Sequence, residues 1–193
     1  MDLGTAMASS RASGISVYGV TAIVGLAGRF DWIEAPPFVE RTWVIAAALL
    51  LFAVEFVIHK VALIDSSWGG VHTLIRPAIG GYLASSLTDT EWSVAALAAS
   101  GVALAFNSHC AKASTRLIVN SSPEPFSNVA VSFGENGMVA VLMTFALTRP
   151  ELALVLTAVL AILSTVVAVM LFRTARRIIR RVRAGLAAPP EAA

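Results

Sequence analysis

Long apolar stretches separated by short polar connections dominate this chain. A helix that crosses the hydrocarbon core of a bilayer needs about 20 mainly apolar residues, and stretches of roughly this length occur six times. They cover residues 14–30, 42–60, 66–87, 92–116, 127–147 and 151–172. The pattern predicts an all-α, polytopic bundle of six transmembrane helices, with residues 1–13 as a cytoplasmic tail before it and residues 173–193 as a basic cytoplasmic tail after it.

The third stretch differs from the others in its helix-breaking residues. Two glycine pairs, Gly69-Gly70 and Gly80-Gly81, flank Pro77 within it. Irregular backbone at membrane depth is tolerated only where protein or water covers its free polar groups. The sequence therefore predicts a kinked or broken third helix that faces the inside of the bundle.

Composition agrees with a membrane protein and suggests its orientation. The chain is 57% hydrophobic and only 13% charged, and its mean hydropathy is +0.78, which is atypical of soluble domains. The net charge of +2 comes mainly from the arginine-rich run Arg173 to Arg183. Under the positive-inside rule this run marks the cytoplasmic side, so we expect both termini in the cytoplasm and no nucleic-acid surface.

Catalytic and cofactor signatures are missing from the sequence. Cys110 is the only cysteine, which excludes an intrachain disulfide and a cysteine-based metal cluster. There is no zinc-binding HExxH pattern, no phosphate-binding or dinucleotide-binding glycine loop, and no nucleophile beside a base. We therefore expect no catalytic residues, no metal and no cofactor.

Ionisable and amide side chains nevertheless occur inside the apolar stretches, where charge is costly and usually functional. Counted at about 1.5 Å of rise per residue, groups on four spans fall in one layer of the cytoplasmic half, with Arg76 deeper. Two roles fit Arg76. It forms a structural ion pair with Glu55 or Glu135, or it forms the floor of a cavity that opens to the cytoplasm. The polar layer and its ion pairs are predicted to contain Glu55, Asp65, Asn107, His109, Glu124, Asn128 and Glu135.

Two connections resemble each other, because each places a cation before an Asx-Ser-Ser triplet that could cap the next helix. The likeness indicates either a parallel repeat, in which predicted spans 2 and 3 correspond to spans 4 and 5, or two ordinary capped turns. Helix starts beside cations suit an anionic group. The predicted anion-binding residues are Lys60, Ser66, Ser67, His72, Arg76, Lys112, Arg116, Asn120, Ser121 and Ser122.

Four motifs resemble a bacterial membrane family catalogued as domain of unknown function 4126, over about residues 14–172. They are Glu55-Phe56 with Lys60 and Asp65-Ser66-Ser67-Trp68, Val71-His72-Thr73 with Ile75-Arg76-Pro77, His109 with Ala111-Lys112-Ala113, and residues 120–128, NSSPEPFSN. The sequence departs from the usual family pattern at Ala62, where a proline is common, and at Gly69, where an acid is common. The resemblance implies a multi-span fold and no defined activity.

Three functions fit these residues. The first is a small transporter or lipid-handling protein that binds an anionic solute or lipid headgroup, with anionic lipid or polyprenyl phosphate as partners. The second is a membrane scaffold or accessory subunit with a structural polar layer. The third is an enzyme acting on a lipid, with His72 and Glu135 or His109 as acid and base. A location in the bacterial cytoplasmic membrane and a homo-oligomer are compatible with each.

Overall fold

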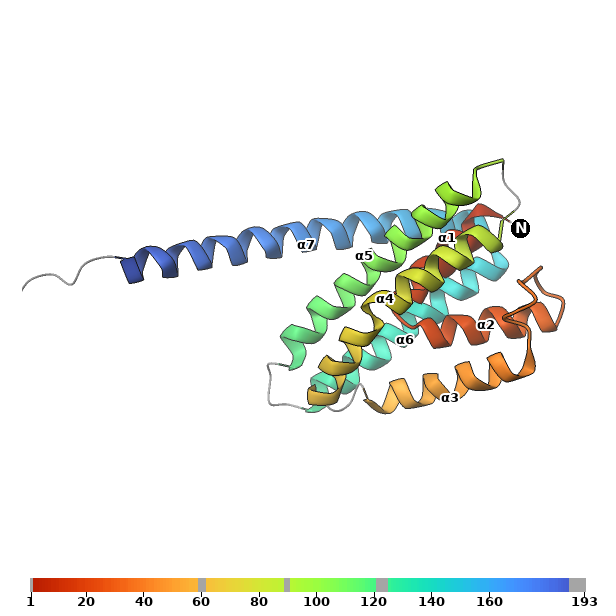
Figure 1. Ribbon diagram of the computed structural model, residues 1–193, viewed down its shortest axis with the longest axis horizontal. Helices are drawn as coiled ribbons and strands as arrows, with labels where there is room; N and C mark the ends of the chain where they lie inside the picture. Colours follow the sequence, from red (N-terminus) through yellow and green to blue (C-terminus); the bar gives the residue numbers. More distant parts are fainter. Residues whose placement is uncertain (1, 59–61, 89–90, 121–124, 188–193) are drawn as a thin grey trace, which may run out of the picture.

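The computed structural model describes residues 2–58, 62–88, 91–120 and 125–187, and within these ranges it is all-helical (Figure 1). The helices are α1 Leu3–Ser13, α2 Val17–Arg29, α3 Thr42–Ile58, α4 Ala62–Ser86, α5 Val94–Asn120, α6 Pro125–Thr148 and α7 Pro150–Ala187. The prediction of an all-α fold is confirmed.

α1 and α2 form a hairpin that reaches only the middle of the bundle. α1 starts beside the turn between α6 and α7, where Gly4 approaches the Pro150 carbonyl closely, and runs inward. The chain then becomes extended at Ser16 (φ −143°, ψ 93°), whose hydroxyl accepts a hydrogen bond from the Gly19 amide and caps α2. α2 returns to the end from which α1 came, where Arg29 binds the first residue of α3, Thr42.

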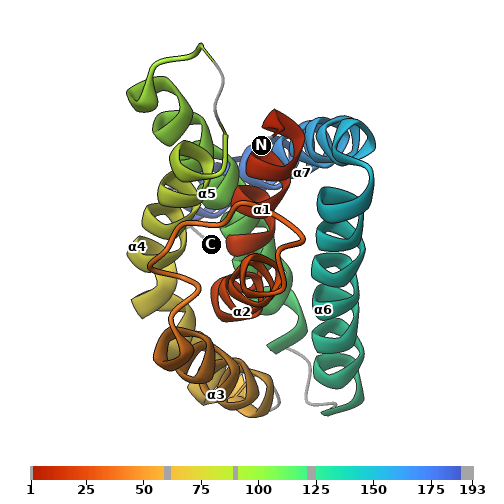
Figure 2. The same cartoon turned by 90° about the vertical axis from the view of Figure 1, so that its right-hand side faces the viewer.

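The five helices that follow run alternately between the two ends of the bundle. α4, α5 and α6 lie along its length, α3 covers α2, and α7 crosses obliquely and projects beyond the other helices (Figures 1 and 2). The start of α1 and the basic end of α7 therefore lie at opposite ends of the bundle.

α1 occupies the centre of the packing. Every side chain from Gly4 to Ser13 is buried. Because most of these side chains are small, the neighbouring helices approach closely. The Ser10 hydroxyl donates to the Gly80 carbonyl of α4 at 2.8 Å, and the Thr5 hydroxyl donates to the Ala146 carbonyl of α6 at 2.7 Å.

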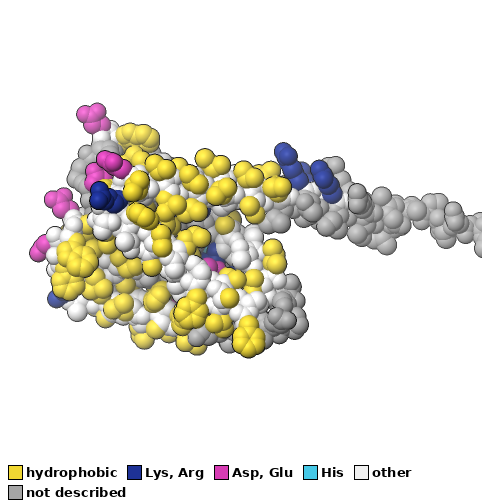
Figure 3. Space-filling view, turned by 180° about the vertical axis from the view of Figure 1, so that it is seen from behind, with side chains coloured by type: hydrophobic (Ala, Val, Ile, Leu, Met, Phe, Trp, Pro, Cys, Tyr) yellow, Lys and Arg dark blue, Asp and Glu magenta, His cyan; other side chains and the backbone are white. Residues whose placement is uncertain are grey.

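The outer surface is largely apolar, as expected for contact with lipid (Figure 3). Among the described residues, three helical segments are long and apolar enough to cross a membrane: Val94–Arg116, Phe126–Thr148 and Pro150–Met170. The predicted membrane character is thereby supported at this coarser level, whereas the count of six spans is not confirmed.

The structure corrects two predictions about the amino-terminal region. Residues 3–13 are not a tail, because their small side chains pack into the core as α1. The stretch predicted as the first span, residues 14–30, is the tip of the hairpin followed by α2, and α2 has only 13 residues. The expectation that both termini share one side depended on six full crossings. The α1–α2 hairpin enters and leaves at the same end of the bundle, so it does not supply the first crossing.

The third predicted span is not broken, and a kink in it stays a prediction. α4 is one continuous helix from Ala62 to Ser86 with Pro77 inside it. The irregular backbone that the glycines and proline predicted lies instead between α1 and α2. Asp65 lies within α4 and Asn120 is the last residue of α5, so neither precedes a helix as a cap, and the proposed repeat is not confirmed.

Candidate functional site

A cluster of five ionisable side chains joins four helices inside the bundle. This charge cluster consists of Glu55 from α3, Arg76 from α4, Lys112 and Arg116 from α5, and Glu135 from α6. Glu55 forms an ion pair with Arg76, and Glu135 accepts two hydrogen bonds from Arg116, at 2.9 and 2.7 Å. Lys112 Nζ lies 3.4 Å from a carboxylate oxygen of each acid. Of the alternatives that the sequence left open for Arg76, the structure contains the ion pair, and its acid is Glu55.

The charge cluster also holds the tip of the α1–α2 hairpin. Arg76 donates to the carbonyl of Gly14 at 3.1 Å, and Lys112 donates to the carbonyl of Ile15 at 2.7 Å. The hydroxyl of Ser16 lies 3.2 Å from the Glu55 carboxylate. Carbonyls at the end of a helix have no partner within that helix, so the cations supply donors where α1 stops.

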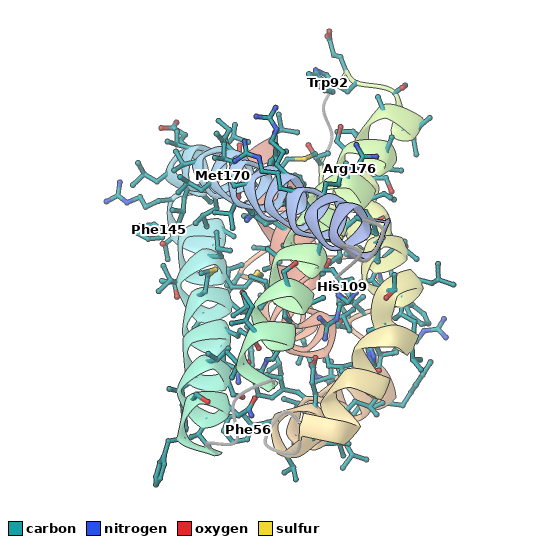
Figure 4. All side chains as sticks on the ribbon, turned by 90° about the vertical axis from the view of Figure 1, so that its left-hand side faces the viewer. Phe56, Trp92, His109, Phe145, Met170 and Arg176 are labelled. Atoms are coloured by element: carbon teal, nitrogen blue, oxygen red, sulfur yellow. The ribbon has the colours of Figure 1, made fainter. Side chains whose placement is uncertain are left out.

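Two histidines lie next to the charge cluster. Arg76 Nη1 is 3.3 Å from His109 Nδ1, and because a guanidinium only donates, this nitrogen accepts. The neutral ring then carries its proton on Nε2 and donates to the Thr73 hydroxyl at 3.1 Å. His72 is hydrogen-bonded to the hydroxyl of Tyr18 at 2.9 Å. Figure 4 shows His109 between α4 and α5, inside the bundle.

A second polar group surrounds Arg11, near the end of α1. Its guanidinium donates to Asn107 of α5 at 3.0 Å and to the Ser164 hydroxyl of α7 at 3.2 Å. Asn107 in turn donates to Thr165 at 2.8 Å. Arg11 is only 3% exposed, and its Nε has no acceptor. Within the described part of the chain, no carboxylate pairs with this buried cation.

Arg11 and Lys112 both line a cavity of about 610 Å³ between α5, α6 and α7. Its other polar groups include Ser108, Glu135 and Ser164, and its walls are otherwise mostly aliphatic. Figure 3 shows a hollow beside α7 in which apolar side chains surround charged groups of both signs. The cavity lies in the half of the bundle towards the end of α5 and the start of α6, because it is lined by residues 108–118 of α5 and 131–138 of α6.

The predicted site residues separate into three sets. The first set is the charge cluster and the two histidines next to it: Glu55, His72, Arg76, His109, Lys112, Arg116 and Glu135. Asn107 belongs to the Arg11 group, and Asn128 is buried with no partner for its Oδ1 among the described residues. The side chains of Lys60, Asp65, Ser66, Ser67, Asn120, Ser121, Ser122 and Glu124 lie outside the described residues.

Sequence reasoning missed Arg11. Most of the segment around it, LGTAMASSRASG, lies before the first long apolar stretch, which begins at residue 14, and is therefore predicted as a tail. Its richness in Ala, Ser and Gly is, however, typical of closely packed membrane helices, and one arginine among such residues is the available signal for a buried cation. Among the described residues, no three His, Cys, Asp or Glu side chains come together in a way that could hold a metal.

These features define an all-helical protein with apolar, membrane-compatible helices around a buried polar site. The chain belongs to the family described as Domain of unknown function (DUF4126), whose model matches residues 3–170. The match includes α1, in agreement with its place in the core, and the predicted family is confirmed. No curated protein and no solved structure matches the chain.

Proposed function

We propose that this protein binds an anionic ligand inside a membrane-embedded bundle, as a small transporter or lipid-handling protein. The observation that carries the proposal is Arg11, a buried cation that lines a cavity and has no carboxylate partner among the described residues. An unpaired charge in a low-dielectric interior is unfavourable. A bound anion would supply the missing partner.

The charge cluster favours a different role for the residues that were first expected to bind the anion. Arg76 and Arg116 already form close contacts with Glu55 and Glu135. This pairing supports a structural role for the layer, as expected of a scaffold. Lys112, which also lines the cavity, is the member of the cluster best placed to assist Arg11.

The proposal predicts opposite effects of one substitution on stability and on binding. Arg11→Met keeps a long, unbranched side chain but removes the charge, so we expect it to raise the thermal stability of the ligand-free protein in neutral detergent. It should also abolish the extra stabilisation that anionic phosphatidylglycerol gives over zwitterionic phosphatidylcholine. Both effects are measurable as thermal shifts.

Two further variants serve as controls for Arg11→Met. Arg11→Lys retains the charge and should retain the preference for the anionic lipid. Arg29→Met removes the same charge from an exposed arginine that contacts Thr42 at the end of α2, and should leave the preference unchanged. If the wild type prefers the anionic lipid and Arg11→Met retains that preference, Arg11 does not bind the anion and the proposed function is wrong.

The orientation proposed here follows from five crossings, by α3 to α7, and a hairpin that enters halfway. The arginine-rich end of α7 is then cytoplasmic under the positive-inside rule, and the start of α1 is on the opposite side. We expect amino-terminal and carboxy-terminal epitope tags to be labelled from opposite sides in sealed vesicles. Labelling of both tags from one side would support six crossings instead.

A further inference from the structure

The walls of the cavity continue onto the outer surface of the bundle. Ile118 is 61% exposed, Leu163 is 55% exposed and Val167 is 54% exposed, although all three line the cavity. The cavity is thus open at an apolar face between helices. In a bilayer such a face is covered by acyl chains, so this opening admits a hydrocarbon chain more readily than a hydrated solute.

The inner end of the cavity has the opposite chemistry. Arg11 and Lys112 place two buried cationic side chains there, and the wall around them also contains the Ser108 and Ser164 hydroxyls and one carboxylate, Glu135. Lys112 is balanced by Glu55 and Glu135, whereas Arg11 is held only by neutral groups. A ligand that fills the whole space therefore needs a negative charge at one end and an apolar body at the other.

The volume also distinguishes between two sources of negative charge. About 610 Å³ lies within the range of roughly 300–1,000 Å³ that is typical of pockets for organic ligands. An inorganic anion at Arg11 would leave most of the aliphatic wall without contacts, and unfilled space forfeits dispersion energy. An anionic lipid satisfies both the charge and the wall.

We infer that the ligand is a membrane lipid with an anionic headgroup. The headgroup binds Arg11 and Lys112, and a chain lies along the walls formed by α5, α6 and α7. The lipid enters sideways from the half of the membrane that faces the α5–α6 end of the bundle. This inference rests on the proposed function, because it identifies the source of the anion bound by Arg11.

A matched pair of glycines on α6 allows the apolar wall to be tested alone. A Cβ atom added at Gly134 or at Gly137 would meet no other atom within 4 Å, but only Gly134 lines the cavity. Gly134→Trp should therefore obstruct the chain-binding space without disturbing the packing, and Gly137→Trp should leave it open. Both variants retain Arg11, and we expect both to fold because both glycines are exposed and the added Cβ has open space at either position.

The experiment measures thermal shifts and native mass spectra of the wild type and both variants with three probes: phosphatidylglycerol, phosphatidylcholine with the same chains, and inorganic phosphate. We expect the wild type and Gly137→Trp to prefer phosphatidylglycerol, and Gly134→Trp to lose that preference. Arg11→Gln should bind phosphatidylglycerol about tenfold to a hundredfold more weakly than the wild type does. This is the range expected for the loss of a charge-assisted hydrogen bond.

Two outcomes would overturn the inference, and they can be told apart. If phosphate stabilises the wild type as much as phosphatidylglycerol does, or if Gly134→Trp binds the lipid normally, the ligand is a small anion or its chain lies elsewhere, and the proposed function survives. If neither anionic probe is preferred over phosphatidylcholine, the proposed function fails together with the inference.

Discussion

Replacement of Arg76 by alanine is expected to cause the largest loss of stability of any single substitution in the charge cluster. Arg76 is 1% exposed, pairs with Glu55 and donates to the Gly14 carbonyl at the hairpin tip. Removing one partner of a buried ion pair commonly costs about 3–5 kcal/mol, because the remaining charge loses its compensation. The free energy of unfolding in mild detergent, or the melting temperature, will measure this loss.

A second substitution shows whether the ion pair is the cause. Arg76→Ala combined with Glu55→Gln removes the uncompensated carboxylate, so we expect the double variant to be more stable than Arg76→Ala alone. Arg149→Ala, at an exposed position in the α6–α7 turn, is the control and should change stability little. If the effects of Arg76→Ala and Glu55→Gln simply add, the two side chains do not interact energetically.

Gly101→Leu is expected to disrupt the contact between α4 and α5. A Cβ atom at Gly101 would lie 2.4 Å from the carbonyl oxygen of Gly80 and 2.5 Å from the Cβ of Ala84. The first of these atoms belongs to the backbone and cannot rotate away, so the two helices would have to separate. Overpacking commonly costs about 1–3 kcal/mol, and we expect a loss at or above the top of this range, measured by thermal unfolding.

The matched control is Gly137→Leu, which adds the same side chain to another long helix. No atom lies within 4 Å of the added Cβ at this position, and leucine favours the helix more than glycine does. Gly137→Leu should therefore unfold at the same temperature as the wild type or slightly above it. Equal destabilisation by both leucines would show that α4 and α5 are not held by this close contact.

The substitutions of Arg76 and Arg11 together distinguish a cation that stabilises the fold from a cation that binds a ligand. Arg76 and Arg11 are both buried, but only Arg76 has a carboxylate partner among the described residues. Removal of the first cation should therefore destabilise the protein, and removal of the second should stabilise it. Residues that are retained at a cost to stability are typical of binding sites, which is why Arg11 and not Arg76 carries the proposed function.

Helix content and the positions of the later helices were accessible from the sequence. The predicted spans at residues 42–60, 66–87 and 127–147 overlap α3, α4 and α6 closely, because a long apolar run in a membrane has to form a helix. The Glu55–Arg76 pair was one of two pairings expected from depth alone. Depth could not decide between Glu55 and Glu135, because the choice depends on how α3 and α6 are placed around α4.

Local patterns were misleading where backbone irregularity was concerned. Gly69-Gly70, Pro77 and Gly80-Gly81 predicted a kinked or broken helix. The helix is not broken, because α4 continues through Pro77, and Gly80 instead serves the close contact with Gly101 and Ala105 of α5. The actual break, at Gly14 to Ser16, is stabilised by donors from Arg76 and Lys112. Those residues lie 62 and 97 positions away in sequence from the carbonyls they contact, so no local pattern contains them.

The sequence by itself determined that this chain forms apolar helices and that the charged groups inside them face the interior of the bundle and not the lipid, because run length and the cost of charge in lipid depend only on the residues themselves. The tertiary structure alone decided that residues 3–13 form the central helix and that Arg11 lines a cavity. A short segment of Ala, Ser and Gly has too little apolar area to fix its own environment. Its position depends on the helices that pack against it, and with that position Arg11 becomes a buried cation in need of a partner.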